Sequence, residues 1–369
     1  MGCDTDVFVV GGGPAGLAAA IAARLKGFRV TVADGAKPPI TKACGEGLLP
    51  DALAALGELG VELGEKDGCP LWGIQFEDDR SSSVCGRFPG VHGLGVRREI
   101  LHQKMMERAS GCGVSLLWNT PVTGIAEDGV MAGGNKVRAR WVIGADGRGS
   151  RVRRWAGLES FGKQRVRFAF RVHYHLEPWS DFTEIHWAQD TQAYVTPVGA
   201  QEICIVLISK KQNSRFDETL LSFPKLVDRL KGAERASTER GAVTSMSRLK
   251  RVYRGNIGLV GDASGSVDAI TAEGLSLSFR QAGALAEALE AGDLQHYQEA
   301  HQRQSRRPWQ VGNLLLMLGR QTELRRRTMR TLVSAPQLFE RVLAYQMGET
   351  RPLELARAGA IFGWTFLAA

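Results

Sequence analysis

The sequence predicts an α/β protein in which a Rossmann-type βαβ domain carries an inserted antiparallel β-sheet and is followed by helices. Three observations lead to this prediction: a glycine-rich turn between an apolar run and a helical pattern near residue 11, alternating apolar and basic residues over 165–175, and helical periodicity from residue 297 onward. The chain has 369 residues, 44% hydrophobic and 23% charged, which suits two domains or one large interrupted domain and argues against a disordered or fibrous protein.

The first thirty-five residues have the pattern of a βαβ unit. Residues 7–10 are apolar throughout, as expected for a strand that is buried on both faces. A helix is predicted over 15–26, and Pro14 suits its first turn because the missing N–H of proline is not needed there. A second strand over 30–32 follows and leads to Asp34.

The turn over 11–16 contains the pattern Gly-x-Gly-x-x-Gly. Gly11 permits a tight turn, Gly13 lets the backbone approach a pyrophosphate, and Gly16 lets the helix pack close to the strand. The first helical residues, Pro14 and Ala15, lie at the positive end of the helix, where anionic groups bind well. The turn therefore predicts a dinucleotide site.

Asp34 lies eighteen residues beyond Gly16, at the end of the second predicted strand. A carboxylate at this position accepts a hydrogen bond from a ribose hydroxyl and disfavours a 2′-phosphate. The predicted ligand is therefore FAD or NAD rather than NADP. The sequence contains no second glycine motif of this kind, so it provides a Rossmann-type binding site for only one dinucleotide.

Two further motifs favour FAD. Residues 142–153, with Asp146, resemble the Asp-Gly fingerprint of flavoprotein hydroxylases, and residues 256–263 resemble a second fingerprint whose Gly261–Asp262 pair binds the ribityl chain. With three motifs in the family's order, the chain is identified as a member of the p-hydroxybenzoate hydroxylase superfamily of FAD-dependent oxidoreductases.

The resemblance implies a fold and a cofactor. The expected fold is a glutathione-reductase-type FAD-binding Rossmann domain with an inserted antiparallel β-sheet substrate domain and C-terminal helices. The expected cofactor is non-covalent FAD, with NAD(P)H or a reduced redox protein as the electron donor. The FAD-binding domain is predicted over 1–70, 95–158 and 250–295, the sheet domain over 71–94 and 159–249, and a basic helical region over 296–369.

Further site residues come from the same resemblance. In this superfamily a helix aims its positive end at the flavin, and the matching segment here includes Glu273, Gly274 and Leu275. Glu273 is a candidate catalytic residue, with a simple helix-terminal acid as the alternative. Arg97 fits the spacing of an arginine that contacts FAD, whereas Arg98 is interpreted as a surface residue.

Residues 42–48 are similar to the Cys-Gly-x-Gly-Leu segment of geranylgeranyl reductases. This similarity implies that Cys44 and Gly45 border the isoalloxazine, with Cys44 a catalytic candidate or a buried unreactive thiol. The stretch 192–197 keeps only Tyr194 and Pro197 of a paired-aromatic motif in those reductases, and Tyr194 is the third catalytic candidate. The absence of the halogenase tryptophans argues against halogenation.

His173 and His175 share the basic face of the predicted strand 165–175. We interpret this as a solvated sheet face, with acid–base groups above the flavin or a site for an anionic substrate as the alternatives. The neighbouring sequence supplies no carboxylate or cysteine to complete a metal site with these histidines. The six cysteines contain no Cys-x-x-Cys pair, and no metal is expected.

The last part of the chain is basic. From His296 to the end there are eleven arginines, no lysine and five glutamates, a net charge of +6. Such a surface suits a membrane of anionic lipids or an acidic carrier protein, and solvated helix faces are the alternative. Nucleic acid is not an expected partner, because no recognition motif accompanies the charge.

The predicted location follows from what the sequence lacks. No apolar stretch is long enough to cross a bilayer, and the N-terminus does not have the pattern of a secretory signal. A cytoplasmic protein is expected, with peripheral binding to the inner membrane face left open.

The leading functional hypothesis is an FAD-dependent oxidoreductase that acts on a hydrophobic isoprenoid-, lipid- or polyketide-like substrate. It would reduce a C=C bond or carry out a flavin-mediated oxidation. The alternative is a monooxygenase that hydroxylates an aromatic or polyketide substrate with NAD(P)H and O2. A third hypothesis is a non-catalytic electron-transfer subunit. The absence of a cysteine cluster for iron–sulfur binding argues against it.

Overall fold

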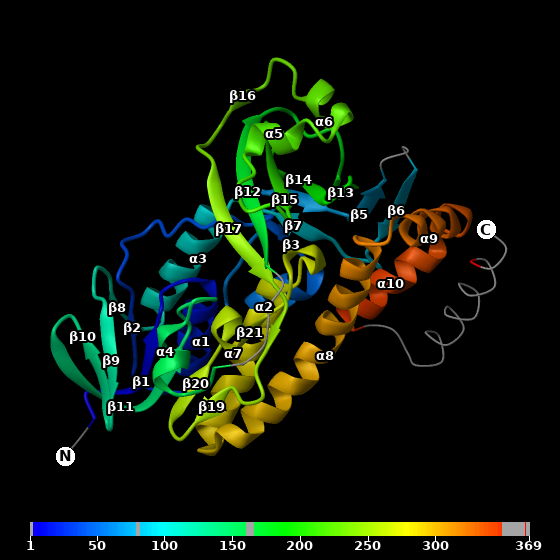
Figure 1. Ribbon diagram of the computed structural model, residues 1–369. Helices are drawn as coiled ribbons and strands as arrows, with labels where there is room; N and C mark the ends of the chain where they lie inside the picture. Colours follow the sequence, from blue (N-terminus) through cyan, green and yellow to red (C-terminus); the bar gives the residue numbers. More distant parts are fainter. Residues whose placement is uncertain (1–2, 79–81, 160–165, 349–365, 367–369) are drawn as a thin grey trace.

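The computed structural model describes residues 3–78, 82–159, 166–348 and 366. Two large sheets dominate this part of the chain, and Figure 1 shows the first at the lower left and the second above it. The predicted helical region continues past 348, but apart from residue 366 that final segment lies outside the described residues. The mixed α/β class predicted from the sequence is confirmed.

The first sheet has a parallel core, flanked by an antiparallel strand and a small meander. In spatial order its strands are β8 (Ser115–Leu117), β2 (Val30–Ala33), β1 (Thr5–Val10), β11 (Asn135–Gly144), β20 (Ile257–Leu259) and β19 (Tyr253–Arg254), with β9 (Val122–Ala126) and β10 (Gly129–Ala132) paired beside β11. Its helices are α1 (Pro14–Leu25), α3 (Arg98–Gly111), α4 (Arg151–Trp155) and α7 (Gly274–Ala291). This is the predicted Rossmann arrangement.

The first helix follows the sequence pattern closely. Helix α1 begins at Pro14, one residue before the predicted start, and almost its whole length is buried. Its many alanines allow α7 to pack against it, with Phe279 and Ala282 of α7 in the same hydrophobic core. The helix that carries the glycine turn is therefore held between the sheet and a second helix.

The second sheet is antiparallel apart from the pairing of β5 with β13. In spatial order its strands are β16 (Glu234–Arg235), β12 (Val166–His175), β15 (Glu202–Ser209), β14 (Thr191–Gly199), β13 (Phe182–Trp187), β5 (Gly73–Glu77) and β6 (Ser83–Arg87), and β17 (Arg240–Ser245) also pairs with β12. The segments 73–87 and 166–245 thus form one continuous sheet.

Smaller elements complete the described structure. These are β3 (Gly47–Leu48), β4 (Cys69–Leu71), β7 (Gly93–Gly95), β18 (Ser247–Arg248), β21 (Gly265–Ser266), α2 (Pro50–Glu58), α5 (Phe216–Leu220), α6 (Pro224–Arg229) and the 3-10 turns η1 (Gly261–Ser264) and η2 (Ala269–Thr271).

The basic face of β12 is not solvated, which corrects the interpretation made from the sequence. Arg167, Arg171 and His173 are all buried, and His175 at the strand end is exposed. The reason is that both faces of this sheet are covered. One face forms a core with α5 and α6, and the opposite face, which carries Ala169, turns toward the rest of the molecule. An alternating pattern shows which residues share a face but not what covers that face.

Of the described C-terminal helices, the first packs along α7 and the last two pack on the edge of the second sheet. In chain order these helices are α8 (Leu294–Leu318), α9 (Thr322–Ser334) and α10 (Gln337–Met347), and Figure 1 shows α9 and α10 beside β6. Phe339 and Leu343 belong to an apolar stripe on α10 and are buried in the core of that sheet, and a Cβ on Gly86 of β6 would meet both side chains. The stripe therefore serves internal packing.

No helix within the described residues combines the length and apolar character needed to span a membrane.

Candidate active site

A cavity of about 560 Å³ lies between the first sheet and the second. The ends of two parallel strands open into it, at Val10 of β1 and Ala33 of β2, and Ala145 lines it directly after β11. Sites for dinucleotides in α/β proteins lie in the crevice beyond the carboxyl ends of the parallel strands. The other wall consists of residues from the second sheet, so the cavity connects the two parts of the molecule.

The glycine turn has the geometry that the motif predicts. Gly11 has a φ of +110°, and a Cβ there would lie 2.6 Å from the carbonyl oxygen of Ala145. A Cβ on Gly16 would lie 1.9 Å from the carbonyl oxygen of Gly11, so Gly16 lets α1 pack against the turn and does not itself line the cavity. Gly13, Pro14 and Ala15 do line it.

Three glycines leave open space along the cavity wall. Gly13, Gly45 and Gly274 all line the cavity, and an added Cβ on any of them would have no heavy atom within 4 Å. They come from three distant segments that the sequence motifs had singled out. A backbone without side chains at these three points forms a cradle that fits a long ligand approaching closely.

The acidic residues of the motifs also reach the cavity. Asp34 accepts hydrogen bonds from the backbone N–H groups of Gly12 (2.7 Å) and Ala36 (2.8 Å). One oxygen of Asp146 accepts the backbone N–H of Arg151 at 2.7 Å, while its Oδ1 is buried with no hydrogen-bond partner among the described residues. Such an unpaired buried oxygen is costly unless a ligand hydroxyl donates to it.

Asp262 of the second fingerprint lines the cavity and forms an ion pair with Lys42, whose Nζ lies 3.2 Å from the carboxylate. Gly261 beside it does not line the cavity. It has a φ of +62°, and its N–H donates to the side chain of Gln281 at 3.0 Å. Gly261 therefore shapes the turn that presents Asp262.

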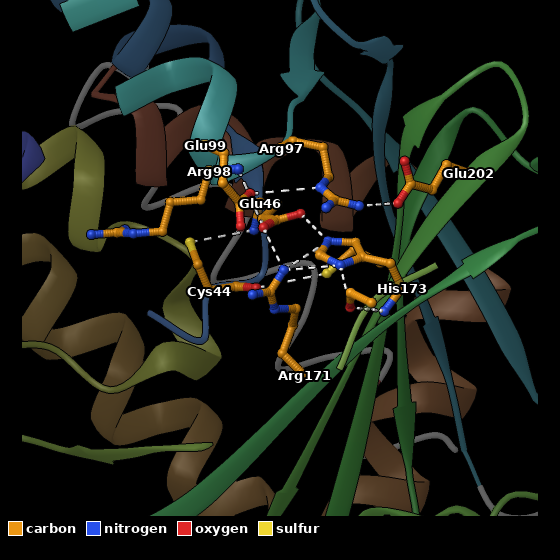
Figure 2. A network of polar contacts seen from close by, with 10 residues as sticks. Cys44, Glu46, Arg97, Arg98, Glu99, Arg171, His173 and Glu202 are labelled. Atoms are coloured by element: carbon orange, nitrogen blue, oxygen red, sulfur yellow. Dashed lines mark hydrogen bonds and ion pairs between the residues drawn. The ribbon is translucent and has the colours of Figure 1, made fainter. Parts of the chain in front are cut away.

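Arg98, rather than Arg97, lines the cavity, which corrects the choice made from the motif spacing. Arg97 turns toward Glu202 of the second sheet, with which it forms an ion pair, and lies 3.6 Å from Glu99. Figure 2 shows the two arginines extending in opposite directions from the start of α3. The Nε of Arg98 is buried and has no hydrogen-bond partner within the described part of the chain, so a bound anion can use it.

Replacement of Arg98 by alanine is expected to weaken FAD binding by about ten- to a hundredfold, because a hydrogen bond to a charged group contributes about 1.5–3 kcal/mol. Arg97→Ala serves as the matched control, since its ion pair lies outside the cavity wall. The dissociation constant of FAD, measured by quenching of flavin fluorescence on the apoprotein, distinguishes them. Equal losses in both variants would contradict the assignment.

The segment 44–46 forms the middle of the cavity wall. Cys44, Gly45 and Glu46 all line it, and the N–H of Glu46 donates to the Cys44 sulfur at 3.4 Å. Glu46 has a φ of +60°, a conformation that side chains rarely adopt. The sequence placed Cys44 here and missed Glu46, which stands at the unspecified position of the Cys-Gly-x-Gly-Leu segment.

The wall formed by the second sheet is apolar. Its lining side chains include Ile74, Ala169, Ile185, Val206 and Ile208 of its strands and Phe88 directly after β6. Tyr194 of β14 also lines the cavity, and burial raises the pKa of its hydroxyl far above the usual value, so it stays protonated. The cavity thus has a polar end at the glycine turn and an apolar end under the sheet.

Glu46 is part of a buried polar network (Figure 2). The Nε2 of His173 lies 2.6 Å from Oε2 of Glu46, and Nη1 of Arg171 lies 3.3 Å from Oε1 of Glu46 and 2.9 Å from Nδ1 of His173. The two residues of the basic strand face therefore act as partners of a cavity-lining carboxylate. Their pairing could not be predicted, because Glu46 and His173 are 127 residues apart in the sequence.

The residues around His173 also correct the expectation that it has no carboxylate or cysteine nearby. Glu46, His173 and Cys204 lie close enough for their ligand atoms to share an ion. The guanidinium of Arg171, however, lies against both Glu46 and His173, and its positive charge opposes a cation there. We therefore treat the group as a hydrogen-bonded network and keep the prediction of no metal as a prediction.

Glu273 lies at the N-cap of α7 and is buried, yet it does not line the cavity. Its two carboxylate oxygens have no hydrogen-bond partner among the described residues. Burial raises the pKa of Glu273 to about 8, and Arg280 offsets part of this rise. The neighbouring Ala272, Gly274 and Leu275 do line the cavity, so the start of α7 borders it while the Glu273 residue itself does not.

Glu273 predicts a pH dependence of stability. The native pKa of about 8 lies above the ordinary 4.5, so from about pH 4.5 to 8 the unfolded chain loses a proton that the native chain keeps. Stability therefore falls as pH rises through this window, by at most about 1.4 kcal/mol per pH unit. Glu273→Gln is expected to remove this fall, and its gain over wild type in urea unfolding should be larger at pH 8 than at pH 5. The exposed Glu340→Gln is the control, and equal gains at both pH values would contradict the prediction.

The fold and the cavity define a flavoprotein: a Rossmann domain whose glycine turn, acidic residues and free arginine fit FAD, joined to a sheet that supplies an apolar wall. The chain belongs to the family of FAD-binding domains described by the model "FAD binding domain", which matches residues 4–312. The resemblance to the p-hydroxybenzoate hydroxylase superfamily is confirmed, and the protein is an FAD-dependent oxidoreductase.

Comparisons with known proteins agree with this assignment. Digeranylgeranylglycerophospholipid reductase 2 of Methanosphaera stadtmanae is 28% identical over 319 residues, which cover 79% of this chain and 80% of that protein. The 6-methylpretetramide 4-monooxygenase of Streptomyces rimosus is 36% identical over 174 residues, 42% of either chain. A geranylgeranyl bacteriochlorophyll reductase-like protein of Thermoplasma acidophilum has the same fold, with a TM-score of 0.74 at 20% identity over 97% of this chain and 99% of that one.

Proposed function

We propose that this enzyme reduces carbon–carbon double bonds in a hydrophobic, isoprenoid- or lipid-like substrate. The observation that carries the proposal is the apolar wall under the second sheet, which lines the same cavity as the segment 44–46. A relative that matches most of the chain is a reductase of geranylgeranyl-bearing phospholipids. The segment 42–48 is also similar to the reductase motif.

In this reaction bound FAD supplies the hydride once it has been reduced. The residues of the chain hold and shield the reactants. Gly13, Asp34, Arg98 and Asp146 hold the cofactor at the polar end, and the side chains of the second sheet keep water away from the apolar chain of the substrate. NAD(P)H is the proposed donor, and it would bind without a nucleotide-binding fold of its own.

The test uses the purified holoenzyme, reduced without air and mixed with a phospholipid that carries geranylgeranyl chains. We expect the flavin absorbance to return and the lipid to gain two hydrogen atoms per turnover, as read by mass spectrometry. A lipid of the same headgroup with saturated chains is the control. Unchanged lipid together with flavin that stays reduced would contradict the proposal.

A second function has one specific observation in its favour. The Streptomyces rimosus relative, which has the highest identity of the three proteins compared, is a monooxygenase. If this chain is also a monooxygenase, adding an aromatic polyketide with NADPH and air will stimulate oxygen uptake, and the product will gain one oxygen atom. Formation of hydrogen peroxide alone, with the polyketide unchanged, would count against it.

We also propose that the C-terminal helices bring the enzyme to the cytoplasmic face of an anionic membrane. Leu314 and Met317 of α8 are exposed apolar side chains, and Arg303, Arg307 and Arg330 are exposed cations on α8 and α9. Apolar side chains among cations favour a lipid surface over an acidic protein. Sedimentation with phosphatidylglycerol vesicles, but not with phosphatidylcholine vesicles, is the expected result, and binding to neither would contradict it.

A further inference from the structure

The carboxylate of Glu46 is unusual among the acids of the cavity. Asp34 and Asp146 accept backbone N–H groups beside the glycine turn and α4, and Asp262 pairs with Lys42. Glu46 instead has a fully buried side chain that packs against β12 of the second sheet, and a strained backbone holds it there. Strain of this kind persists where the surroundings fix the residue, and it is common at functional sites.

Groups from every side fix this carboxylate. From the second sheet, Arg171 and His173 contact it, and from α3 the backbone N–H of Arg98 donates to its Oε1 at 3.2 Å. Glu99 lies farther along α3 and Cys204 on β15, and burial raises the pKa of the Cys204 thiol well above its usual value, which keeps that thiol neutral. Glu46 and His173 thus form a buried hydrogen-bonded pair among these groups.

His173 connects Glu46 with the outside of the protein. Its Nε2 faces Glu46, and its Nδ1 lies 2.9 Å from the hydroxyl of Ser237. The backbone N–H of His173 also donates to that hydroxyl, at 3.1 Å, so the hydroxyl proton can point at Nδ1, which it shares with Nη1 of Arg171 at 2.9 Å. Ser237 is half-buried, and residues 238–240 after it are exposed. The three side chains therefore form a continuous hydrogen-bonded path from the surface to the cavity.

We propose that Glu46 is the proton donor of the enzyme and that His173 and Ser237 return its proton from solvent. The proposal rests on the proposed reduction of a double bond. In that reaction one carbon receives the hydride and the other carbon receives a proton from Glu46, so the π bond breaks and two C–H bonds form. His173 then passes its Nε2 proton to Glu46 and takes one at Nδ1 from Ser237, whose hydroxyl regains its proton from water. The substrate is reduced, the cofactor is oxidised and Glu46 is protonated again. His173 is left with its proton on Nδ1 instead of Nε2, so its ring must exchange that proton with water before the next turnover.

Glu46 must be protonated before it can donate, and the same path can supply this proton. Reduction of the cofactor adds negative charge to the cavity, and a nearby negative charge favours the neutral form of a carboxyl group. Glu46 is therefore expected to take up a proton when the flavin is reduced and to release it to the substrate. A residue that merely held the loop in place would not change its protonation at this step.

Infrared difference spectra of the holoenzyme test this directly, without any substrate. On anaerobic photoreduction of the flavin, wild type is expected to gain a band in the carbonyl-stretch region of protonated carboxylic acids, and this band should shift in D2O. Glu46→Gln should lack it. Glu202→Gln, which loses a carboxylate outside the network, should keep it. Absence of the band in wild type, or its persistence in Glu46→Gln, overturns the proposal.

Single-turnover kinetics supply the second readout. Pre-reduced enzyme is mixed with the geranylgeranyl-bearing phospholipid, and we expect flavin reoxidation to slow about a hundredfold in Glu46→Gln and about tenfold in His173→Gln, with normal FAD content and normal reduction by dithionite. Equal rates in wild type and both variants overturn the proposal. If Glu46→Gln fails to retain FAD, the rate of flavin reoxidation in His173→Gln decides the test instead. If wild type does not react with this lipid, the proposed function fails, and the infrared result alone decides the role of Glu46.

Discussion

Alanine at position 16 is expected to destabilise the protein by about 1–3 kcal/mol or more and to abolish FAD binding. The added Cβ would lie 1.9 Å from the carbonyl oxygen of Gly11 and 3.2 Å from the Cβ of Ala145, both of which belong to the rigid junction of β1, α1 and β11. Because the first of these contacts is with backbone, no side chain can move aside. The helix must shift away from the sheet, and the cavity opens at its polar end.

Gly13→Ala is the matched control. Position 13 has a negative φ and open space around an added Cβ, so we expect the free energy of unfolding of the apoprotein to stay within about 0.5 kcal/mol of wild type. FAD binding should still weaken, since the methyl group enters the cavity. Urea unfolding of the apoproteins and FAD titration separate the two effects. Similar unfolding curves for Gly16→Ala and wild type would show that the packing argument is wrong.

Asp268→Asn is expected to lower the free energy of unfolding by about 3–5 kcal/mol. Asp268 and Arg167 form a buried ion pair with 1% and 11% of their side chains exposed, and the pair joins β12 to the segment before η2. The substitution keeps the hydrogen bond that Asp268 accepts from the N–H of Ile270 and leaves Arg167 charged and buried without its partner. Because the ion pair joins the two parts, its loss should loosen the second sheet from the FAD-binding part. The cavity should be affected as well, since Val267 and Ala269 beside the pair line it.

A double-mutant cycle with Arg167→Met measures this coupling. We expect the double variant to be more stable than the sum of the single losses indicates, since it contains no unpaired buried charge. Asp228→Asn is the control, because its ion pair with Lys231 is about 70% exposed on both sides and should contribute less than about 1 kcal/mol. Additive losses at 167 and 268 would mean that the ion pair does not join the two parts of the molecule.

Much of the candidate site was predictable because its signals are local. The spacing of Gly11, Gly13 and Gly16 encodes a turn that needs only a strand before it and a helix after it. Asp34 follows directly on β2 and Asp146 comes two residues after β11, so the sequence also places them at the correct edge of the sheet. The structure brings these residues into the cavity wall or, for Gly16, into the packing beneath it.

Other parts of the site depend on contacts between distant segments. The choice between Arg97 and Arg98 depends on where Glu202 of the second sheet lies, since it attracts the first and leaves the second for the cavity. The role of Glu46 depends in the same way on the face of β12 that meets it. No pattern within one segment carries such information.

The sequence by itself determined the class of fold and the dinucleotide turn, because strand and helix periodicity and glycine spacing act over a few residues. Its resemblance to the flavoprotein fingerprints implied the flavin. Tertiary structure alone decided that the basic face of β12 is buried, that α10 uses its apolar stripe to cover β6, and that Glu46 meets His173 across 127 residues. The physical reason is that a side chain's charge state, partner and exposure are set by whatever packs on it, and here those partners come from distant parts of the chain.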